Sequence, residues 1–393
     1  MKIRIVTLGC KLNFAESSAL MNTLIARGHT RAKQGEEADL VIVNTCTVTD
    51  TADHKDRQAI HRVKRENPNA RVIVTGCYAK LKPEEIAAMA EVDHVVTKAD
   101  KEFQHAYSKD DRTRCFLKVQ DGCNYFCTYC TIPMARGRSR NPEIKEVILE
   151  AEKALNEGAK EIVITGVNTG DFGRSTGETF IDLLKALDNM QREDGTRDYR
   201  IRISSCEPNL LTDEIIEFIA ASEHFAPHFH IPLQSGSDEV LRIMHRHYDT
   251  RLFSERIDHI KQVLPQAFIG VDCMVGVRGE TEERWEEYLN YVKSLPVSQL
   301  HVFTYSERAN TKMVAMDLPT VPKKERERRS KILHQISDEK LAAFYAQNKG
   351  RKATVLWESK KSGDLMYGFT ENYIKTSGPY DKRKVNTFER IIL

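Results

Sequence analysis

The stretch that decides the fold is "GCNYFCTYCTIPMARGRSR", residues 122–140. It places Cys123, Cys127 and Cys130 within eight residues, although the whole chain of 393 residues has only nine cysteines. A structural zinc ion needs four tetrahedral ligands, and no fourth cysteine or histidine follows this trio closely. An iron–sulfur cluster that is held by three thiolates and keeps one iron open fits the spacing better.

Strands and helices alternate on the C-terminal side of this stretch. Six runs rich in β-branched and aromatic residues are predicted strands, at residues 115–120, 161–166, 200–205, 228–234, 268–276 and 299–306. Helices intervene, for example over residues 142–158, with Pro142 in the first turn and Gly158 as the C-terminal cap. Six such units predict a parallel (β/α)6 barrel, which is partial because a closed barrel of this kind has eight.

The first hundred residues predict a separate α/β domain with a parallel sheet. Its strands are expected at "KIRIVTL", "DLVIVNT" and "ARVIVTG", and helical periodicity covers residues 13–28 and 51–67. A cysteine follows each strand, at Cys10, Cys46 and Cys77. A single cysteine here would read as a small buried hydrophobic residue. Three at equivalent strand ends meet at one edge of a parallel sheet, which favours a second metal site.

The remaining segments complete the domain organisation. We expect an N-terminal domain over 1–98, a linker over 99–114, the barrel over 115–320, a connecting helix over 321–347 and a β-rich module over 348–393. The last segment holds ten lysines and arginines against five acidic residues. We therefore expect a small basic β-module at the C-terminus.

Composition narrows the class of protein. The formal net charge is only +2, so any basic surface must come from local clustering. No apolar run is long enough to cross a bilayer and no signal peptide is evident, so we expect a cytoplasmic protein without a membrane partner. An odd number of scattered cysteines does not indicate a disulfide framework, and Cys115, Cys206 and Cys273 are expected in the core.

The C-x3-C-x2-C spacing, with Tyr129 just before the last cysteine, resembles the signature of the radical S-adenosylmethionine (radical SAM) superfamily. The resemblance implies that the open iron binds SAM and that an electron from the cluster cleaves it to methionine and a 5′-deoxyadenosyl radical. It also implies that Tyr129 lies near the adenine of SAM.

With its second trio of cysteines, the whole chain resembles the radical SAM methylthiotransferase family. That resemblance implies two [4Fe-4S] clusters, two SAM molecules with different fates, and a C-terminal RNA-binding module of the TRAM type. The six cysteines would be the catalytic cluster ligands. An electron donor such as a flavodoxin or ferredoxin is also implied.

The motif "TLGCKLN", residues 7–13, resembles the branch that acts on threonylcarbamoyladenosine in tRNA. We therefore expect an enzyme that adds a methylthio group to carbon 2 of that nucleoside beside the anticodon. Two alternatives stay open: isopentenyladenosine as the substrate, and a non-enzymatic iron–sulfur carrier with an RNA-binding tail. Tyr129 and the full barrel argue against a carrier.

Polar residues at the ends of the barrel strands are candidates for the cofactor pocket, since barrel chemistry lies at that face. By resemblance, several of them should line the SAM pocket: Gly166, Asn168, Ser205, Glu207, Gln234 and Asp272. Glu207 has an alternative role as an ion-pair partner of a barrel arginine such as Arg202. His228 and His230 are expected to pack or to form hydrogen bonds rather than to bind metal.

Basic residues point to an RNA partner, the anticodon stem-loop of a tRNA. Arg136, Arg138 and Arg140 follow the cysteine loop, where they could reach phosphates. Lys382, Arg383 and Lys384 lie in the tail among aromatic residues that could stack on unpaired bases.

Overall fold

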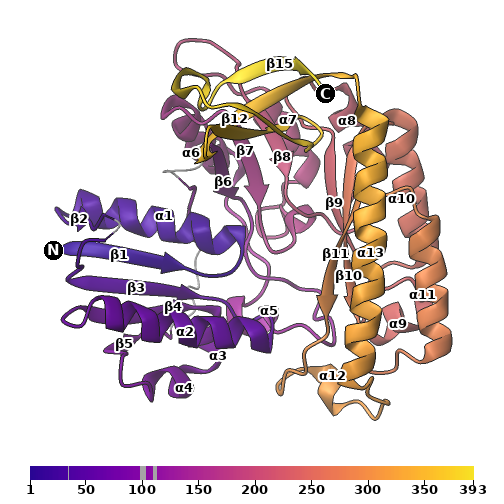
Figure 1. The fold of residues 1–393 in the computed structure, drawn as a ribbon, viewed down its shortest axis with the longest axis horizontal. Helices are drawn as coiled ribbons and strands as arrows, with labels where there is room; N and C mark the ends of the chain where they lie inside the picture. The colour runs from indigo at the N-terminus through magenta and orange to yellow at the C-terminus, as the bar shows by residue number, and fades with distance from the viewer. Residues whose placement is uncertain (34, 98–102, 109–112) are drawn as a thin grey trace.

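The N-terminal domain is a five-stranded parallel sheet covered by helices (Figure 1). The structure is a computed structural model that describes residues 1–33, 35–97, 103–108 and 113–393. The strand order is β2-β1-β3-β4-β5. The strands are β1 (Lys2–Thr7), β2 (Thr30–Arg31), β3 (Leu40–Thr45), β4 (Arg71–Gly76) and β5 (His94–Val95). The helices are α1 (Lys11–Ala26), α2 (Asp50–Glu66), α3 (Cys77–Leu81) and α4 (Pro83–Ala87).

The predicted barrel is present as two parallel three-stranded sheets, β6-β7-β8 and β9-β10-β11. A parallel bridge between Ile201 and Phe225 joins the sheets at the β8–β9 seam. The strands are β6 (Arg114–Lys118), β7 (Glu161–Thr165), β8 (Arg200–Ile203), β9 (His228–Gln234), β10 (Phe268–Val275) and β11 (Gln299–Thr304). Their apolar residues share one core with the outer helices. The main outer helices are α6 (Ile144–Asn156), α7 (Phe180–Asp188), α8 (Asp213–Ala221), α9 (Asp238–Ile243), α10 (Thr250–Val263) and α11 (Glu282–Ser294).

Helix α6 corrects one prediction. It begins at Ile144, so Pro142 lies before the helix rather than in its first turn. The Glu146 carboxylate accepts a hydrogen bond from the Glu143 N–H at 3.0 Å, which fixes the start of the helix there. Gly158 follows the last turn with a φ of 101°, as a C-terminal glycine should.

The predicted linker is only partly described, since residues 99–102 and 109–112 lie outside the described ranges. Residues 103–108 are not a free polar connection. Ala106 and Tyr107 are buried, and Tyr107 bridges Leu117 on β6. The Lys118 N–H donates to the Ala106 carbonyl at 2.9 Å, so this segment extends the barrel wall.

The C-terminal module is an antiparallel sheet that follows the long helix α13 (Lys323–Asn348). Its strand order is β14-β13-β12-β15, with β12 (Lys352–Ser362), β13 (Leu365–Thr370), β14 (Lys375–Pro379) and β15 (Phe388–Ile392). Arg200, the first residue of β8, donates to the Thr354 and Phe369 carbonyls at 3.2 Å each. The module therefore caps the N-terminal ends of the barrel strands (Figure 1). None of the helices in the described ranges has the length and apolar character needed to span a bilayer.

Candidate functional site

The first cysteine trio lies on the loop that follows β6, at the C-terminal end of the barrel. The Cys123 N–H donates to the Gly137 carbonyl at 3.1 Å, so the returning chain supports the loop. Burial raises the pKa of Cys123 to about 11 and that of Cys130 to about 12, and the neighbouring thiols of the trio add to both shifts. Thiols that resist ionisation together need a cationic partner before they can act as thiolates.

The described side chains do not form a mononuclear metal site. In the described part of the chain, no three cysteine, histidine or acidic side chains converge on one metal-ion position. A mononuclear zinc site requires such convergence. The thiolates of a four-iron cluster bind different irons and stand further apart.

The guanidinium group of Arg246 contacts the cysteine loop through two hydrogen bonds. It donates to Cys127 Sγ at 3.1 Å and to the Tyr129 hydroxyl at 3.3 Å, and it forms an ion pair with Glu207. No local pattern in the sequence points to Arg246, which lies in "MHRHYD" between α9 and α10. Glu207 does pair with an arginine of the barrel, but this arginine is Arg246 rather than Arg202. Arg202 pairs with Glu161 at 3.1 Å inside the barrel, whereas Glu207 lies beyond the end of β8.

Two of the polar residues predicted at the strand ends have buried side-chain atoms without a hydrogen-bond partner in the described residues. Both amide atoms of Asn168 and Oε1 of Gln234 are buried and accept or donate no hydrogen bond within the described residues. A Cβ at Gly166 would lie 2.9 Å from Gln120 Oε1, so the glycine allows the backbone to lie close to the Gln120 side chain. Unpaired buried amides are costly. A ligand that offers donors and acceptors, as the amino and carboxylate groups of SAM do, would satisfy them.

Two other candidates already have partners within the protein. Asp272 accepts a hydrogen bond from His230 Nε2 at 2.7 Å, and this contact lowers the pKa of its carboxyl against the opposing effect of burial. The Ser205 carbonyl accepts a hydrogen bond from the Thr169 hydroxyl. His228 stacks on Phe268, so both predicted histidines pack or form hydrogen bonds as expected.

The structure brings the second cysteine trio together. Cys10 precedes α1, Cys46 follows β3 and Cys77 begins α3. All three line one cavity of about 680 Å³. The barrel supplies another wall of this cavity, through Gly166 and Asp272. The second trio therefore faces the C-terminal end of the barrel, where the first trio lies.

Two glycines allow the cysteine-bearing loops of the N-terminal domain to lie close together. Gly9 has a φ of +100°, and a Cβ there would lie 2.7 Å from Cys46 Cβ. Gly76 has a φ of +96°, and a Cβ there would lie 2.4 Å from the Thr45 carbonyl oxygen. Any other residue at either position would combine a strained backbone with a clash.

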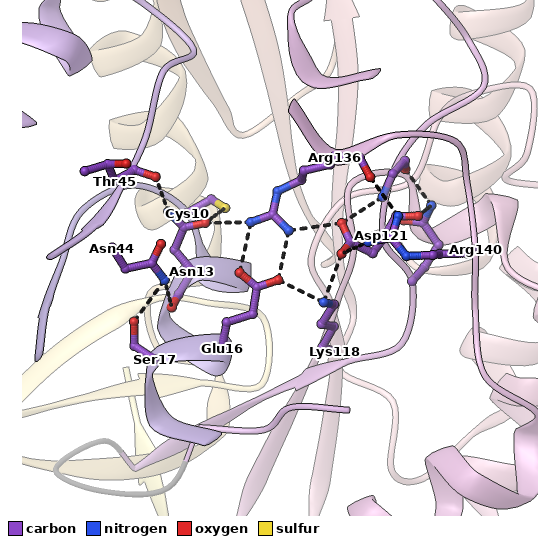
Figure 2. Close-up of polar contacts among 12 residues, drawn as sticks. Cys10, Asn13, Glu16, Ser17, Asn44, Thr45, Lys118, Asp121, Arg136 and Arg140 are labelled. Carbon is purple, nitrogen blue, oxygen red and sulfur yellow. Dashed lines mark hydrogen bonds and ion pairs between the residues drawn. The ribbon is translucent and has the colours of Figure 1, made fainter. Parts of the chain in front are cut away.

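A buried polar network joins the two sites (Figure 2). Arg136 donates to Asn13 Oδ1 at 2.7 Å, to Glu16 Oε1 at 2.9 Å and to Asp121 Oδ1 at 3.0 Å. Asn13 donates in turn to the Thr45 carbonyl, one residue before Cys46. Asp121 lies two residues before Cys123, so Arg136 connects both cysteine loops.

This network corrects the expectation that Arg136 binds RNA. Its side chain is 7% exposed and committed to protein partners. Arg140 is also engaged, with Asp121 at 2.9 Å. Arg138 differs, because it is exposed and lies over the ring of the exposed Phe126. Of the three loop arginines, Arg138 is the one placed to meet an outside partner.

Comparison with known proteins places the chain in a family. Residues 2–97 match "Uncharacterized protein family UPF0004" and residues 117–292 match the "Radical SAM superfamily". A Bacillus subtilis protein named threonylcarbamoyladenosine tRNA methylthiotransferase MtaB is 38% identical, over 94% of this chain and 88% of that protein. An Aquifex aeolicus protein of the same name is 34% identical, over 95% and 96%.

The chain belongs to the radical SAM methylthiotransferase family.

Solved structures agree on the fold. A radical SAM methyltransferase, TsrM from Kitasatospora setae, superposes with a TM-score of 0.55 at 14% identity, covering 80% of this chain and 77% of that one. The radical SAM match implies SAM and a [4Fe-4S] cluster as cofactors of this methylthiotransferase.

In this methylthiotransferase a second arginine also ties the N-terminal domain to the barrel. Arg308 follows β11 and donates to the Thr47 hydroxyl at 2.6 Å. It forms ion pairs with Asp50 at 2.6 Å and with Asp53 at 3.0 Å. Thr47 directly follows Cys46, so Arg308 fixes that cysteine loop. Sequence reasoning missed this contact because its partners are about 260 residues apart.

The basic tail residues lie on the surface, away from both trios. Lys382, Arg383 and Lys384 form one exposed turn between β14 and β15. Arg383 pairs with Asp381 and Lys384 pairs with Glu389, each at 2.8 Å. These acidic neighbours reduce the positive charge that the turn presents.

Proposed function

We propose that this enzyme adds a methylthio group to carbon 2 of threonylcarbamoyladenosine beside the anticodon of tRNA, with two [4Fe-4S] clusters and two SAM molecules. The observation that carries the proposal is the second trio, Cys10, Cys46 and Cys77, in a cavity closed by the barrel face that bears the first trio. Relatives from Rickettsia prowazekii and Thermotoga maritima, named for this substrate, are 33% and 32% identical.

Each trio has a distinct task in this proposal. Cys123, Cys127 and Cys130 would hold the cluster that binds SAM, and the second trio would hold the cluster that carries sulfur. When bound, these groups would supply reductive cleavage of SAM and a sulfur atom for transfer. The unpaired amides of Asn168 and Gln234 would position SAM. The shared cavity would keep the target carbon between the two sites and exclude water.

The RNA must present an unstacked base, because carbon 2 of a stacked adenosine is out of reach. Arg138 and the exposed Phe126 on the cysteine loop suit a phosphate and a base respectively. The C-terminal module would act as a TRAM-like support for the anticodon stem, through Lys382, Arg383 and Lys384. A tRNA substrate would place the reaction in the cytoplasm, with a flavodoxin or ferredoxin as the electron donor.

A second substrate has specific support. A Desulfitobacterium hafniense protein named tRNA-2-methylthio-N(6)-dimethylallyladenosine synthase is 29% identical over 99% of this chain. The dimethylallyl group is the isopentenyl group of the alternative above. It is uncharged, whereas the threonylcarbamoyl group carries a carboxylate.

Nucleoside mass spectrometry of tRNA decides between the substrates. A strain that lacks the gene should lose 2-methylthio-threonylcarbamoyladenosine and accumulate its precursor, and the gene in trans should restore it. Loss of the methylthio isopentenyl nucleoside instead would support the second substrate. Unchanged methylthio nucleosides would refute both.

A further inference from the structure

We propose that Lys55 binds the carboxylate of the substrate's threonine group and so favours threonylcarbamoyladenosine over a substrate with an uncharged N6 substituent. The inference rests on the proposed function and adds a specificity-determining residue to it. Lys55 lies on α2 and lines the cavity of about 680 Å³ that holds the second trio.

Lys55 is a cation without a partner in the wall of this cavity. Its side chain is exposed, and it forms no hydrogen bond and no ion pair with any residue of the described ranges. Thr51 lines the same cavity, and its hydroxyl also has no hydrogen-bond partner in the part of the chain that the structure describes. Residues four apart on a helix are neighbours on its surface. The two side chains therefore offer adjacent donors to an anionic ligand.

Contacts with the barrel fix the position of this part of α2. Arg308, which follows β11, pairs with Asp50 at 2.6 Å and with Asp53 at 3.0 Å, both in the first turn of the helix. The Asp50 N–H also donates to the Ser306 hydroxyl at 3.1 Å. Lys55 follows about half a turn after Asp53. The helix therefore holds Lys55 at the cavity that the barrel also lines.

The other charged residues of the cavity wall already have partners within the protein. Arg136 pairs with two carboxylates of the buried network. Asp272 accepts a hydrogen bond from a barrel histidine at 2.7 Å, and Asp56 accepts one from a backbone N–H at 2.9 Å. Among the described residues that line the cavity, Lys55 is thus the cation that remains free to pair with a ligand.

The chemistry of the substrate matches a cation at this place. Threonine joined to N6 through a carbamoyl group keeps its free carboxylate, which extends several bonds beyond the base. Carbon 2 and N6 both belong to the Watson–Crick edge of adenine, so a base that presents carbon 2 to the second trio keeps its N6 substituent in the same cavity. The exposed Lys55 is open to a carboxylate that reaches out along the wall. A dimethylallyl group would leave the ammonium hydrated, so the selection comes from the attraction that only the acid gains.

The test compares the binding of charged and neutral substrates. The enzyme reconstituted with both clusters is titrated with an anticodon stem-loop that carries threonylcarbamoyladenosine, and with the same stem-loop carrying its methyl ester, and fluorescence anisotropy gives each Kd. Because solvent screens an exposed ion pair, we expect the wild type to bind the acid about threefold to tenfold more tightly than the ester. Lys55→Gln should remove this preference, Lys55→Arg should keep most of it, and Lys55→Glu should reverse it.

The matched control is Arg65→Gln, which removes an exposed positive charge from the same helix at a residue that does not line the cavity in the described structure. It should keep the wild-type preference for the acid. An equal loss of affinity for acid and ester in Lys55→Gln would show that Lys55 contacts a phosphate, and this result would overturn its role in selection.

Two further outcomes would also overturn that role. One is equal Kd values for acid and ester in the wild type, which needs no variant to fold. The other is a preference for the acid that Lys55→Gln retains. The proposed function is tested separately, by adding SAM and a reductant. A wild-type enzyme that methylthiolates neither stem-loop overturns the proposed function, whatever the binding preference is.

Discussion

At the scale of single residues, Arg246 is the side chain that couples the first cysteine trio to its surroundings. Its hydrogen bond to Cys127 Sγ brings a positive charge to one ligand thiol. Burial raises the pKa of that thiol, and Arg246 opposes the shift. Hydrogen bonds to cluster sulfurs and nearby positive charge raise the reduction potential of an iron–sulfur cluster. Arg246 should therefore make the SAM-binding cluster easier to reduce.

We predict that Arg246→Gln moves the potential of this cluster about 60 mV lower, which corresponds to a factor of ten for one electron. An EPR-monitored redox titration measures the shift, and SAM cleavage should slow with it. Arg246→Lys should fall between the two. The matched control is Arg242→Gln, since Arg242 is exposed and pairs with Glu239 on the same helix. A potential equal to that of the wild type in an iron-replete variant would show that Arg246 has a purely structural role.

At the scale of elements, Glu16 on α1 forms an ion pair with Arg136, which follows the first trio on the same loop. Burial pushes the pKa of Glu16 up, but Arg136 and Lys118 outweigh it, so the pKa in the folded protein is lowered. A lowered carboxyl pKa stabilises the fold above the ordinary value of 4.5, and the contribution is lost as the pH falls through the lowered value.

We predict that Glu16→Gln destabilises the protein by about 3 kcal/mol at neutral pH, because it removes one partner of a buried charge network. Thermal unfolding measures the loss. The gap should close as the pH falls from 4.5 through the lowered pKa, because the wild-type carboxylate is protonated first in the unfolded chain and then in the folded protein. Glu37→Gln, at an exposed site of the same domain, should leave the stability unchanged. A pH-independent gap would mean that packing, not charge, is responsible.

The sequence predicted those elements that carry a strong local pattern. The β-branched runs gave β1, β3 and β4, and all six barrel strands, with boundary errors of one or two residues. It missed β2 and β5, because edge strands of two residues leave no periodicity. In the C-terminal module, β14 begins only at Lys375, because Tyr373 turns the chain with a φ of 67°.

For the functional site too, local signals were predicted from the sequence and long-range contacts were not. Spacing and strand ends pointed to both trios, because those signals are local. Arg246 and Arg308 were missed, and Arg136 was misassigned to RNA, because partners that are far away in the sequence leave no trace in the local pattern.

At the scale of the whole molecule, the two trios should act as separable sites that Arg136 and Arg308 keep face to face. We predict that changing Cys10, Cys46 and Cys77 together to alanine lowers the iron content from about eight to about four atoms per chain. The variant should still form 5′-deoxyadenosine from SAM under reduction, yet transfer no methylthio group. The mirror variant, with alanine at Cys123, Cys127 and Cys130, should also hold about four irons but cleave no SAM. A folded, iron-loaded N-terminal variant that cannot cleave SAM would contradict the separation.

The role of the C-terminal module in RNA binding is better tested by substitution than by truncation. Removing residues 348–393 would strip Arg200 and Arg202 of their carbonyl partners and uncover Phe268, so truncation would confuse stability with RNA binding. Substituting the charges of Lys382, Arg383 and Lys384 with glutamine avoids this, because none of them is buried.

We expect this triple variant to bind the anticodon stem-loop more weakly and with a shallower salt dependence. Each lost phosphate contact should reduce the slope of log K against log salt by about 0.7 to 0.9. The pairs with Asp381 and Glu389 offset part of the charge, so the total change should be nearer one contact than three. The matched control is glutamine at Lys323 and Lys324, two exposed residues at the start of α13. Identical slopes for the triple variant and the wild type would assign the module to capping the barrel and leave RNA contact to Arg138 and Phe126 on the cysteine loop.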